Sequence, residues 1–160
     1  MDSSNQEGQE KKRRDKLKVL PVPFALEEIK DNIYIKTNTH STFDREQIIR
    51  EAFKLHAQGN IQKALKYYQY FLNQGHSDYR VFLNYGVILK DLGKLKEAEL
   101  LYRKAIELKS DYAEAHSNLG LVFRDLGKLQ EAELSTRKVI ELNPNHEEAH
   151  SNLGNILTDL

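Results

Sequence analysis

Three asparagines recur at one spacing in the C-terminal half of the chain. Asn84, Asn118 and Asn152 stand 34 residues apart. A side-chain amide carries both a donor and an acceptor, so a row of amides suits the backbone of an extended peptide whatever its sequence. The alternative is that these amides cap or bridge neighbouring helices and touch no ligand. Arg50 occupies the same register one period earlier, so such a row would begin at Asn84.

Charged residues recur beside this row. Lys90 and Arg124 follow the asparagines by one to two helical turns, and Asp91 and Asp125 come directly after them. Two basic side chains could clamp a carboxylate, but the adjacent acids would oppose this by Coulomb repulsion. We therefore expect these four residues to line a binding surface of modest charge selectivity.

The adjacent pairs His116–Ser117 and His150–Ser151 raise the question of catalysis or metal binding. Adjacent side chains on a helix point about 100° apart, so neither pair forms a nucleophile and base. The two histidines fall on helices whose axes are at least about 8–10 Å apart, whereas zinc-bound nitrogens lie about 2 Å from the ion. We expect no catalytic residue, no metal and no cofactor.

The charge balance argues against partners held by charge alone. The chain has 24 basic and 24 acidic residues, without the basic excess expected of a protein that grips nucleic acid or an anionic membrane. A basic run at 11–18 has acidic neighbours and is interpreted as solvated. Cysteine is absent, and no apolar run approaches the roughly 18 residues of a membrane span. We expect a cytoplasmic protein.

Two regions differ in periodicity. Residues 1–43 show no sustained helical period and contain Pro21 and Pro23, so they are predicted to be a disordered or extended leader. From Asp44 onward, apolar residues recur at spacings of three and four, which predicts an all-α fold. The predicted helices are 44–58, 61–73, 79–91, 95–108, 113–125, 129–142 and 147–159.

The helices repeat as hairpins of 34 residues. Aligning 79–112 with 113–146 gives identity at 16 of 34 positions without a gap. Gly59, Gly93 and Gly127 each come just after the first helix of a hairpin, where a left-handed residue ends a helix.

Two further glycines, Gly86 and Gly120, fall in the middle of a helix, at a cost of about 1 kcal/mol in helix propensity. They indicate that a neighbouring helix approaches closely, with Ala98 and Ala132 as the expected partners.

This pattern resembles the tetratricopeptide repeat, a helical hairpin of the same length with small residues in both helices. The matching positions are Ala52, Gly59, Ala64, Tyr68 and Phe71 in a weaker first repeat, Gly86, Gly93, Ala98, Tyr102 and Ala105 in the second, and Leu119, Gly120, Phe123, Gly127, Ala132 and Pro144 in the third. The family's frequent tryptophan is replaced by Phe82, His116 and His150, and its terminal proline by His76 and Ser110. The repeats are 45–78, 79–112, 113–146 and the first helix of a fourth at 147–160.

The resemblance implies an α-α superhelix whose first helices line a concave groove. The repeat pattern is similar to that of bacterial arrays and to that of the superhelix of O-linked N-acetylglucosamine transferases. In the transferases, an asparagine ladder holds the peptide backbone. The implied function is a scaffold that binds an extended peptide or a partner segment. The alternative is the recruiting part of a larger enzyme, such as a glycosyltransferase, with its catalytic domain beyond Leu160.

The last predicted helix carries apolar residues on a face with no second helix to cover it. Leu153, Ile156, Leu157 and Leu160 are expected to be partly uncovered. Three explanations are open: a fragment of a longer protein, which we favour, a last helix that is itself the cap, or self-association through this face.

Overall fold

The structure is a computed structural model and describes residues 44–160. The predicted leader at 1–43 and its basic run lie outside the described residues. Within the described part, all regular structure is helical, as predicted. The helices are α2 (Arg45–Ala57), α3 (Ile61–Asn73), α4 (Tyr79–Asp91), α5 (Leu95–Leu108), α6 (Ala113–Asp125), α7 (Leu129–Leu142) and α8 (Glu147–Asp159).

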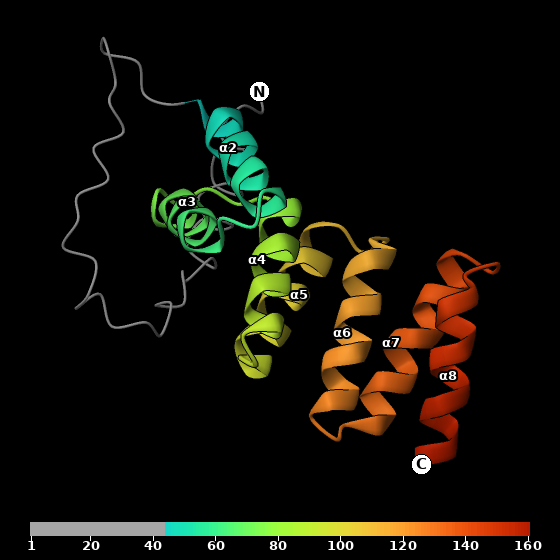
Figure 1. The fold of residues 1–160 in the computed structure, drawn as a ribbon. Helices are drawn as coiled ribbons and strands as arrows, with labels where there is room; N and C mark the ends of the chain where they lie inside the picture. The colour runs from blue at the N-terminus through green and yellow to red at the C-terminus, as the bar shows by residue number, and fades with distance from the viewer. Residues whose placement is uncertain (1–43) are drawn as a thin grey trace, which may run out of the picture. The chain divides into compact units, whose positions relative to one another are not determined.

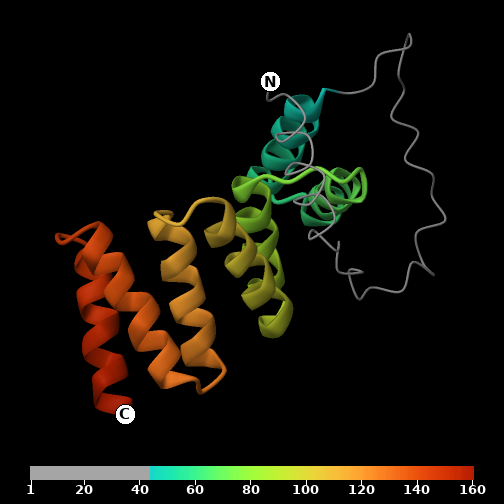
Figure 2. The same cartoon turned by 180° about the vertical axis from the view of Figure 1, so that it is seen from behind.

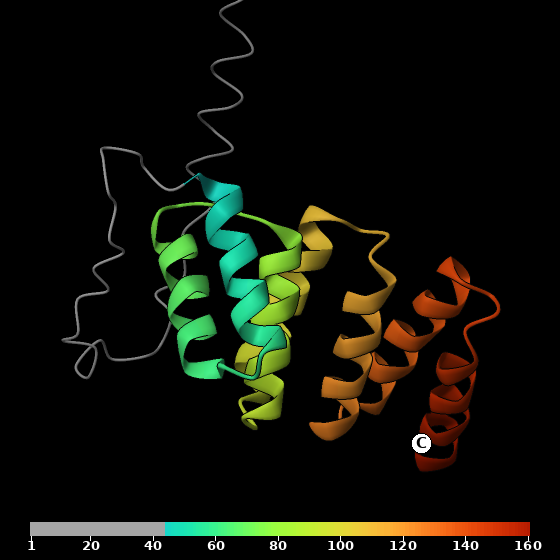
Figure 3. The ribbon, with the colours of Figure 1, turned by 45° about the horizontal axis from the view of Figure 1, so that its top comes forward.

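Each hairpin packs against the next in chain order. The pairs α2/α3, α4/α5 and α6/α7 lie side by side as hairpins, and α8 packs on α7 (Figures 1 and 2). Contacts are therefore between neighbours in the sequence, as in a solenoid. Tilting the view shows α6, α7 and α8 as successive layers (Figure 3).

Left-handed glycines end the first helices, as predicted. Gly59, Gly93 and Gly127 have φ of 71–72°. After α4, Gly93 N donates to Lys90 O at 2.9 Å and Lys94 N donates to Leu89 O at 2.8 Å. These two bonds satisfy carbonyls that the helix itself leaves open.

A fourth left-handed glycine, Gly75, was not predicted as a helix stop. It has φ of 76° and follows α3, which has 13 residues where α5 and α7 have 14. The other two second helices are followed instead by Lys109 and Asn143, whose backbones are extended. The chain therefore leaves the first hairpin by a different turn from the one it uses after the second and third hairpins.

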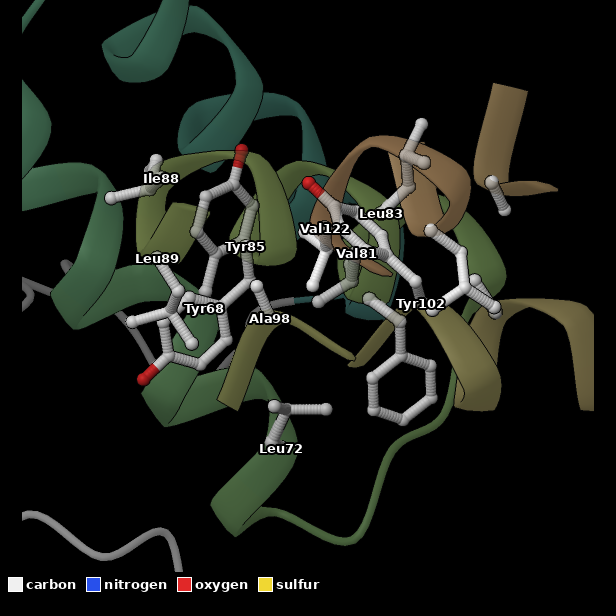
Figure 4. Close-up of a cluster of buried hydrophobic side chains, with 14 of the residues drawn as sticks. Tyr68, Leu72, Val81, Leu83, Tyr85, Ile88, Leu89, Ala98, Tyr102 and Val122 are labelled. Atoms are coloured by element: carbon white, nitrogen blue, oxygen red, sulfur yellow. The ribbon is translucent and has the colours of Figure 1, made fainter. Parts of the chain in front are cut away.

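The core is rich in tyrosine at the junction of the first two hairpins. Tyr68 and Tyr85 are almost fully buried, and their rings stack with centroids 6.0 Å apart (Figure 4). Gln69 Nε2 donates to the Tyr85 hydroxyl at 3.3 Å, and the Tyr68 hydroxyl bonds to His56 Nδ1 at 3.3 Å. Polar groups in this part of the core are thus paired.

Tyr102 makes the close approach to Gly86. An ideal Cβ built on Gly86 would lie 2.6 Å from Tyr102 Cε1, and the three nearest atoms all belong to Tyr102, so the closest approach to Gly86 comes from this ring and not from the predicted Ala98. Ala98 is fully buried nonetheless. The Tyr102 hydroxyl is buried without a hydrogen-bond partner in the described residues, and burial, with the charges of Asp91 and Glu114, raises the pKa of Tyr102.

The third repeat differs because Thr136 stands where Tyr102 stands in the second. An ideal Cβ on Gly120 would lie 3.1 Å from Thr136 Oγ1 and 3.6 Å from the Ala132 carbonyl oxygen. The expected approach of Ala132 to Gly120 is therefore present, through the backbone of α7.

The last helix has one packed side and one open side. Ile156 is 2 % exposed, so the prediction that it would be partly uncovered is wrong; it lines the same small hollow as the α7 residues Thr136 and Val139. Leu157 and Leu160 are 48 % and 53 % exposed, as expected. Nothing lies within 4 Å of an ideal Cβ on Gly154, the counterpart of Gly86 and Gly120.

Candidate functional site

The predicted asparagines share one conformation where their hydrogen bonds are seen. Asn84 Nδ2 donates to Arg80 O at 2.9 Å, and Asn118 Nδ2 donates to Glu114 O at 3.0 Å. The Asn152 side chain makes no hydrogen bond within residues 44–160. All three side chains are half-buried. The bonds of Asn84 and Asn118 remain inside one helix, so these two amides do not bridge neighbouring helices.

Each asparagine stands four residues after another recurring position. Residues four apart share one helix face, so the second and sixth residues of α2, α4, α6 and α8 form one row per helix. We call this set the first-helix stripe. It consists of Glu46, Arg50, Arg80, Asn84, Glu114, Asn118, Glu148 and Asn152.

Ion pairs join the stripe across the first two repeats. Arg80 Nη1 and Nη2 each contact one oxygen of Glu46 at 3.2 Å. The same guanidinium donates to Asp78 from Nε at 3.0 Å and from Nη2 at 2.9 Å. Arg45 Nη2 donates to Asp78 Oδ2 at 3.2 Å and to Ser77 O at 2.7 Å. The second residues of α2 and α4 therefore lie next to one another.

Asp78 is also the N-cap residue of α4. Its Oδ1 accepts the Arg80 backbone N–H at 2.9 Å, the usual N-cap bond. Burial disfavours the Asp78 carboxylate, but hydrogen bonds from Arg80 and the charges of Arg80 and Arg45 outweigh burial and lower the pKa. The hydrogen bonds to Asp78 and Glu46 raise the pKa of Arg80 in turn.

Sequence reasoning missed this network, although the signal was present. Glu46 and Arg80 are 34 residues apart and opposite in charge, and the period places them on adjacent first helices.

The other predicted site residues are only partly brought together. Lys90 Nζ lies 4.0 Å from Asp91 Oδ1, and their side chains are 24 % and 66 % exposed. Arg124 is half-buried and Asp125 is exposed. Arg124 and Asn152, from adjacent first helices, line one hollow of about 10 Å³, enough for about one water molecule.

The two repeated histidines hold the loops that precede their helices. His116 Nε2 bonds to Ser110 O at 2.9 Å, and His150 Nε2 bonds to Pro144 O at 2.8 Å. In the described residues, no group of three or more His, Asp or Glu side chains could hold a metal ion. No helix between residues 44 and 160 is long and apolar enough to cross a membrane.

Comparisons with known proteins agree with this architecture. A family model described as "TPR repeat" matches residues 86–127, and one described as "Tetratricopeptide repeat" matches 113–146. The first TPR of Spaghetti (RPAP3), solved with the HSP90 peptide SRMEEVD, is 26% identical, with a TM-score of 0.67 over 72% of this chain and 94% of that chain. A search of curated proteins found no match.

Two structures of lower identity share the fold. MamA is 20% identical, with a TM-score of 0.69 over 72% of this chain and 68% of that chain. The Yersinia enterocolitica type III secretion chaperone SycD, solved with a YopD peptide, is 24% identical, with a TM-score of 0.66 over 74% and 96% of the two chains. The chain therefore contains tetratricopeptide repeats within residues 86–146, and its stacked helical hairpins at 44–160 share the fold of these solved structures.

Proposed function

We propose that the array is a non-enzymatic scaffold that binds an extended peptide along the first-helix stripe. The observation that carries this is that Asn84 and Asn118, one period apart, make the same hydrogen bond to the carbonyl four residues earlier. The relative with the HSP90 peptide, 26% identical to this chain, supports peptide binding as the role of such an array.

The asparagine amides have the hydrogen-bonding capacity that this role requires. At Asn84 and Asn118, one N–H is used inside the helix, which leaves the second N–H and the Oδ1 for a ligand. An extended peptide presents backbone N–H and C=O groups along its length. Because the asparagine amides would contact the peptide backbone, the asparagines by themselves would accept many sequences.

Lys90, Arg124, Asp91 and Asp125 flank the asparagines in this proposal. Each basic residue has an acid beside it in the sequence, so the four together add little net charge. We assign them a modest, salt-sensitive contribution to affinity and not a dedicated clamp for a carboxylate.

Replacing Asn84, Asn118 and Asn152 together by alanine is expected to weaken peptide binding at least tenfold. Each lost hydrogen bond is worth about 0.5–1.5 kcal/mol, and a factor of ten corresponds to about 1.4 kcal/mol. Binding of an arrayed library of ten-residue peptides, followed by titration of the strongest binders, would measure this.

The matched control is Asn73→Ala with Asn143→Ala, because both asparagines are exposed outside the stripe. Equal loss of thermal stability in the two sets would exclude unfolding as the cause. Unchanged peptide affinity in the triple variant would refute the role of the asparagines.

A second candidate is self-association through α8, favoured by the open space at Gly154 and by the exposure of Leu157 and Leu160. If this face joins two copies, light scattering of the wild-type protein will give a dimer, and Leu157→Lys will give a monomer. Leu134→Lys, on α7 at 69 % exposure, introduces the same charge elsewhere and should leave the dimer intact. A wild-type monomer at high concentration would dispose of this candidate.

Two further predictions from the sequence stay predictions. That the chain recruits partners for a larger enzyme is tested by whether the reading frame continues past Leu160. That it is cytoplasmic is tested by fractionation of the cells that make it.

A further inference from the structure

The charge of the first helices changes sign along the array. Helix α2 carries three basic and two acidic side chains, and α4 carries two and one. Helix α6 carries one basic and two acidic side chains, and α8 carries three acidic and no Lys or Arg. A ligand that spans these helices therefore meets a positive field at one end and a negative field at the other.

The ion pair of Glu46 and Arg80 shows how side chains meet along this row. Both are the second residue of a first helix, and their bidentate contact at 3.2 Å joins adjacent repeats. One and two periods after Arg80, the same position is occupied by Glu114 and Glu148. The stripe thus passes from a neutralised pair to two acids in succession.

No basic side chain in the described residues forms an ion pair with Glu114 or Glu148. Glu114 accepts a hydrogen bond from the Tyr112 hydroxyl at 3.2 Å, and both glutamates are exposed. Arg80 is already occupied by Glu46 and Asp78. Like charges at neighbouring positions on one surface repel, so a ligand cation would be favoured there.

The other end of the stripe presents a cation. Arg50 is exposed and makes no ion pair within residues 44–160, whereas the other two basic residues of α2 are paired, Arg45 with Asp78 and Lys54 with Glu51. Arg50 stands at the register that asparagine occupies in the other three first helices. Arg50 therefore gives the first-helix stripe a positive charge at a position where the other three first helices carry a neutral asparagine.

We propose that the first-helix stripe selects a dipolar extended peptide, with an acidic side chain at Arg50 and basic side chains at Glu114 and Glu148. The inference rests on the proposed function, because it concerns the same surface. Taking about 8–10 Å for each of the three repeat steps from α2 to α8 gives a span of about 24–30 Å, and an extended peptide rises about 3.3 Å per residue. The acidic and basic ends of the peptide should therefore be about eight residues apart.

The test uses fluorescent ten-residue peptides with blocked termini and a neutral Ser/Ala centre. One carries two Asp at one end and two Arg at the other, one carries Asp at both ends, and one carries Arg at both ends. At 10–20 mM salt, where screening is weak, the wild-type protein is expected to bind the dipolar peptide about tenfold more tightly than the Asp-only peptide.

Charge reversal at the acidic end should invert this preference. Glu114→Lys with Glu148→Lys is expected to bind the Asp-only peptide more tightly than the dipolar one. Glu107→Lys with Glu131→Lys makes the same change in net charge at exposed positions of α5 and α7 and should retain the wild-type order. A nitroxide on the Arg end of the dipolar peptide should broaden amide signals of α8 and not those of α2.

The two levels of the hypothesis fail differently. Binding that depends on Asn84, Asn118 and Asn152 but responds equally to both glutamate double variants would overturn the charge selection alone. Binding of the peptides that is insensitive to the asparagines, or no binding of any of them, would overturn the proposed function and this inference with it.

Discussion

Asp78→Ala is expected to lower the free energy of unfolding by about 2–3 kcal/mol, because one carboxylate caps α4 and joins two repeats. Asp78 is only 8 % exposed, and it accepts bonds from the Arg80 backbone, the Arg80 side chain and Arg45. Loss of an N-cap costs about 1 kcal/mol, and hydrogen bonds to charged groups are worth about 1.5–3 kcal/mol. Urea unfolding of the variant, followed by circular dichroism, measures the loss.

The variant Asp78→Asn distinguishes the contribution of the carboxylate charge to stability from that of the N-cap hydrogen bond. Asparagine also caps helices well, so this variant should lose only the charge-dependent part of the effect. The folded protein lowers the pKa of Asp78, so the charge stabilises the fold above the unfolded value of about 3.9. That contribution disappears as the pH falls through the folded-state pKa.

The difference in the free energy of unfolding between wild type and Asp78→Asn should therefore be largest at neutral pH and become smaller below about pH 4. A difference that does not change between pH 7 and pH 3 would contradict the role of the ionised carboxylate.

Glycine-to-alanine substitutions at one repeat position are expected to act in opposite directions. At Gly86 the new methyl group would lie 2.6 Å from the fully buried ring of Tyr102, which has little room to move. Overpacking costs about 1–3 kcal/mol, and alanine regains about 1 kcal/mol of helix propensity. Gly86→Ala should therefore destabilise the array by up to about 2 kcal/mol.

At Gly154 the same change meets nothing within 4 Å, so the gain in helix propensity is uncompensated. Gly154→Ala should stabilise α8 by up to about 1 kcal/mol. Gly120→Ala, with Thr136 Oγ1 at 3.1 Å, should fall between the two. Unfolding the three variants in urea under one set of conditions measures the order of their stabilities. Equal stabilisation by Gly86→Ala and Gly154→Ala would contradict the contact with Tyr102.

The stability of these variants depends on which side chain faces each glycine, and the repeat pattern could not show that. The period predicted that something approaches Gly86 closely, and it favoured Ala98 because alanine is small and recurs. The structure instead places Tyr102 there and Thr136 at the equivalent place in the next repeat. A ring and a hydroxyl at one aligned position pack differently because their shapes differ, although the backbone repeats.

The sequence predicted the positions of the candidate site residues along the helices, but it did not predict their hydrogen bonds and ion pairs. The spacing of Asn84, Asn118 and Asn152 placed them on equivalent first helices, which the helix bounds confirm. The bonds of Asn84 and Asn118 to carbonyls of their own helices depend on side-chain rotamers, which spacing does not determine. The pairing of Arg80 with both Glu46 and Asp78 depends on how α2 and α4 come together.

By itself the sequence determined the helices, their hairpin order and the stops at Gly59, Gly93 and Gly127, because apolar periodicity and left-handed glycines act within a few residues. Only the tertiary structure decided the turn at Gly75, the burial of Ile156 and the open face at Gly154. Those features depend on which helix lies opposite, and residues that repeat in sequence are not given the same neighbours at every position in the stack.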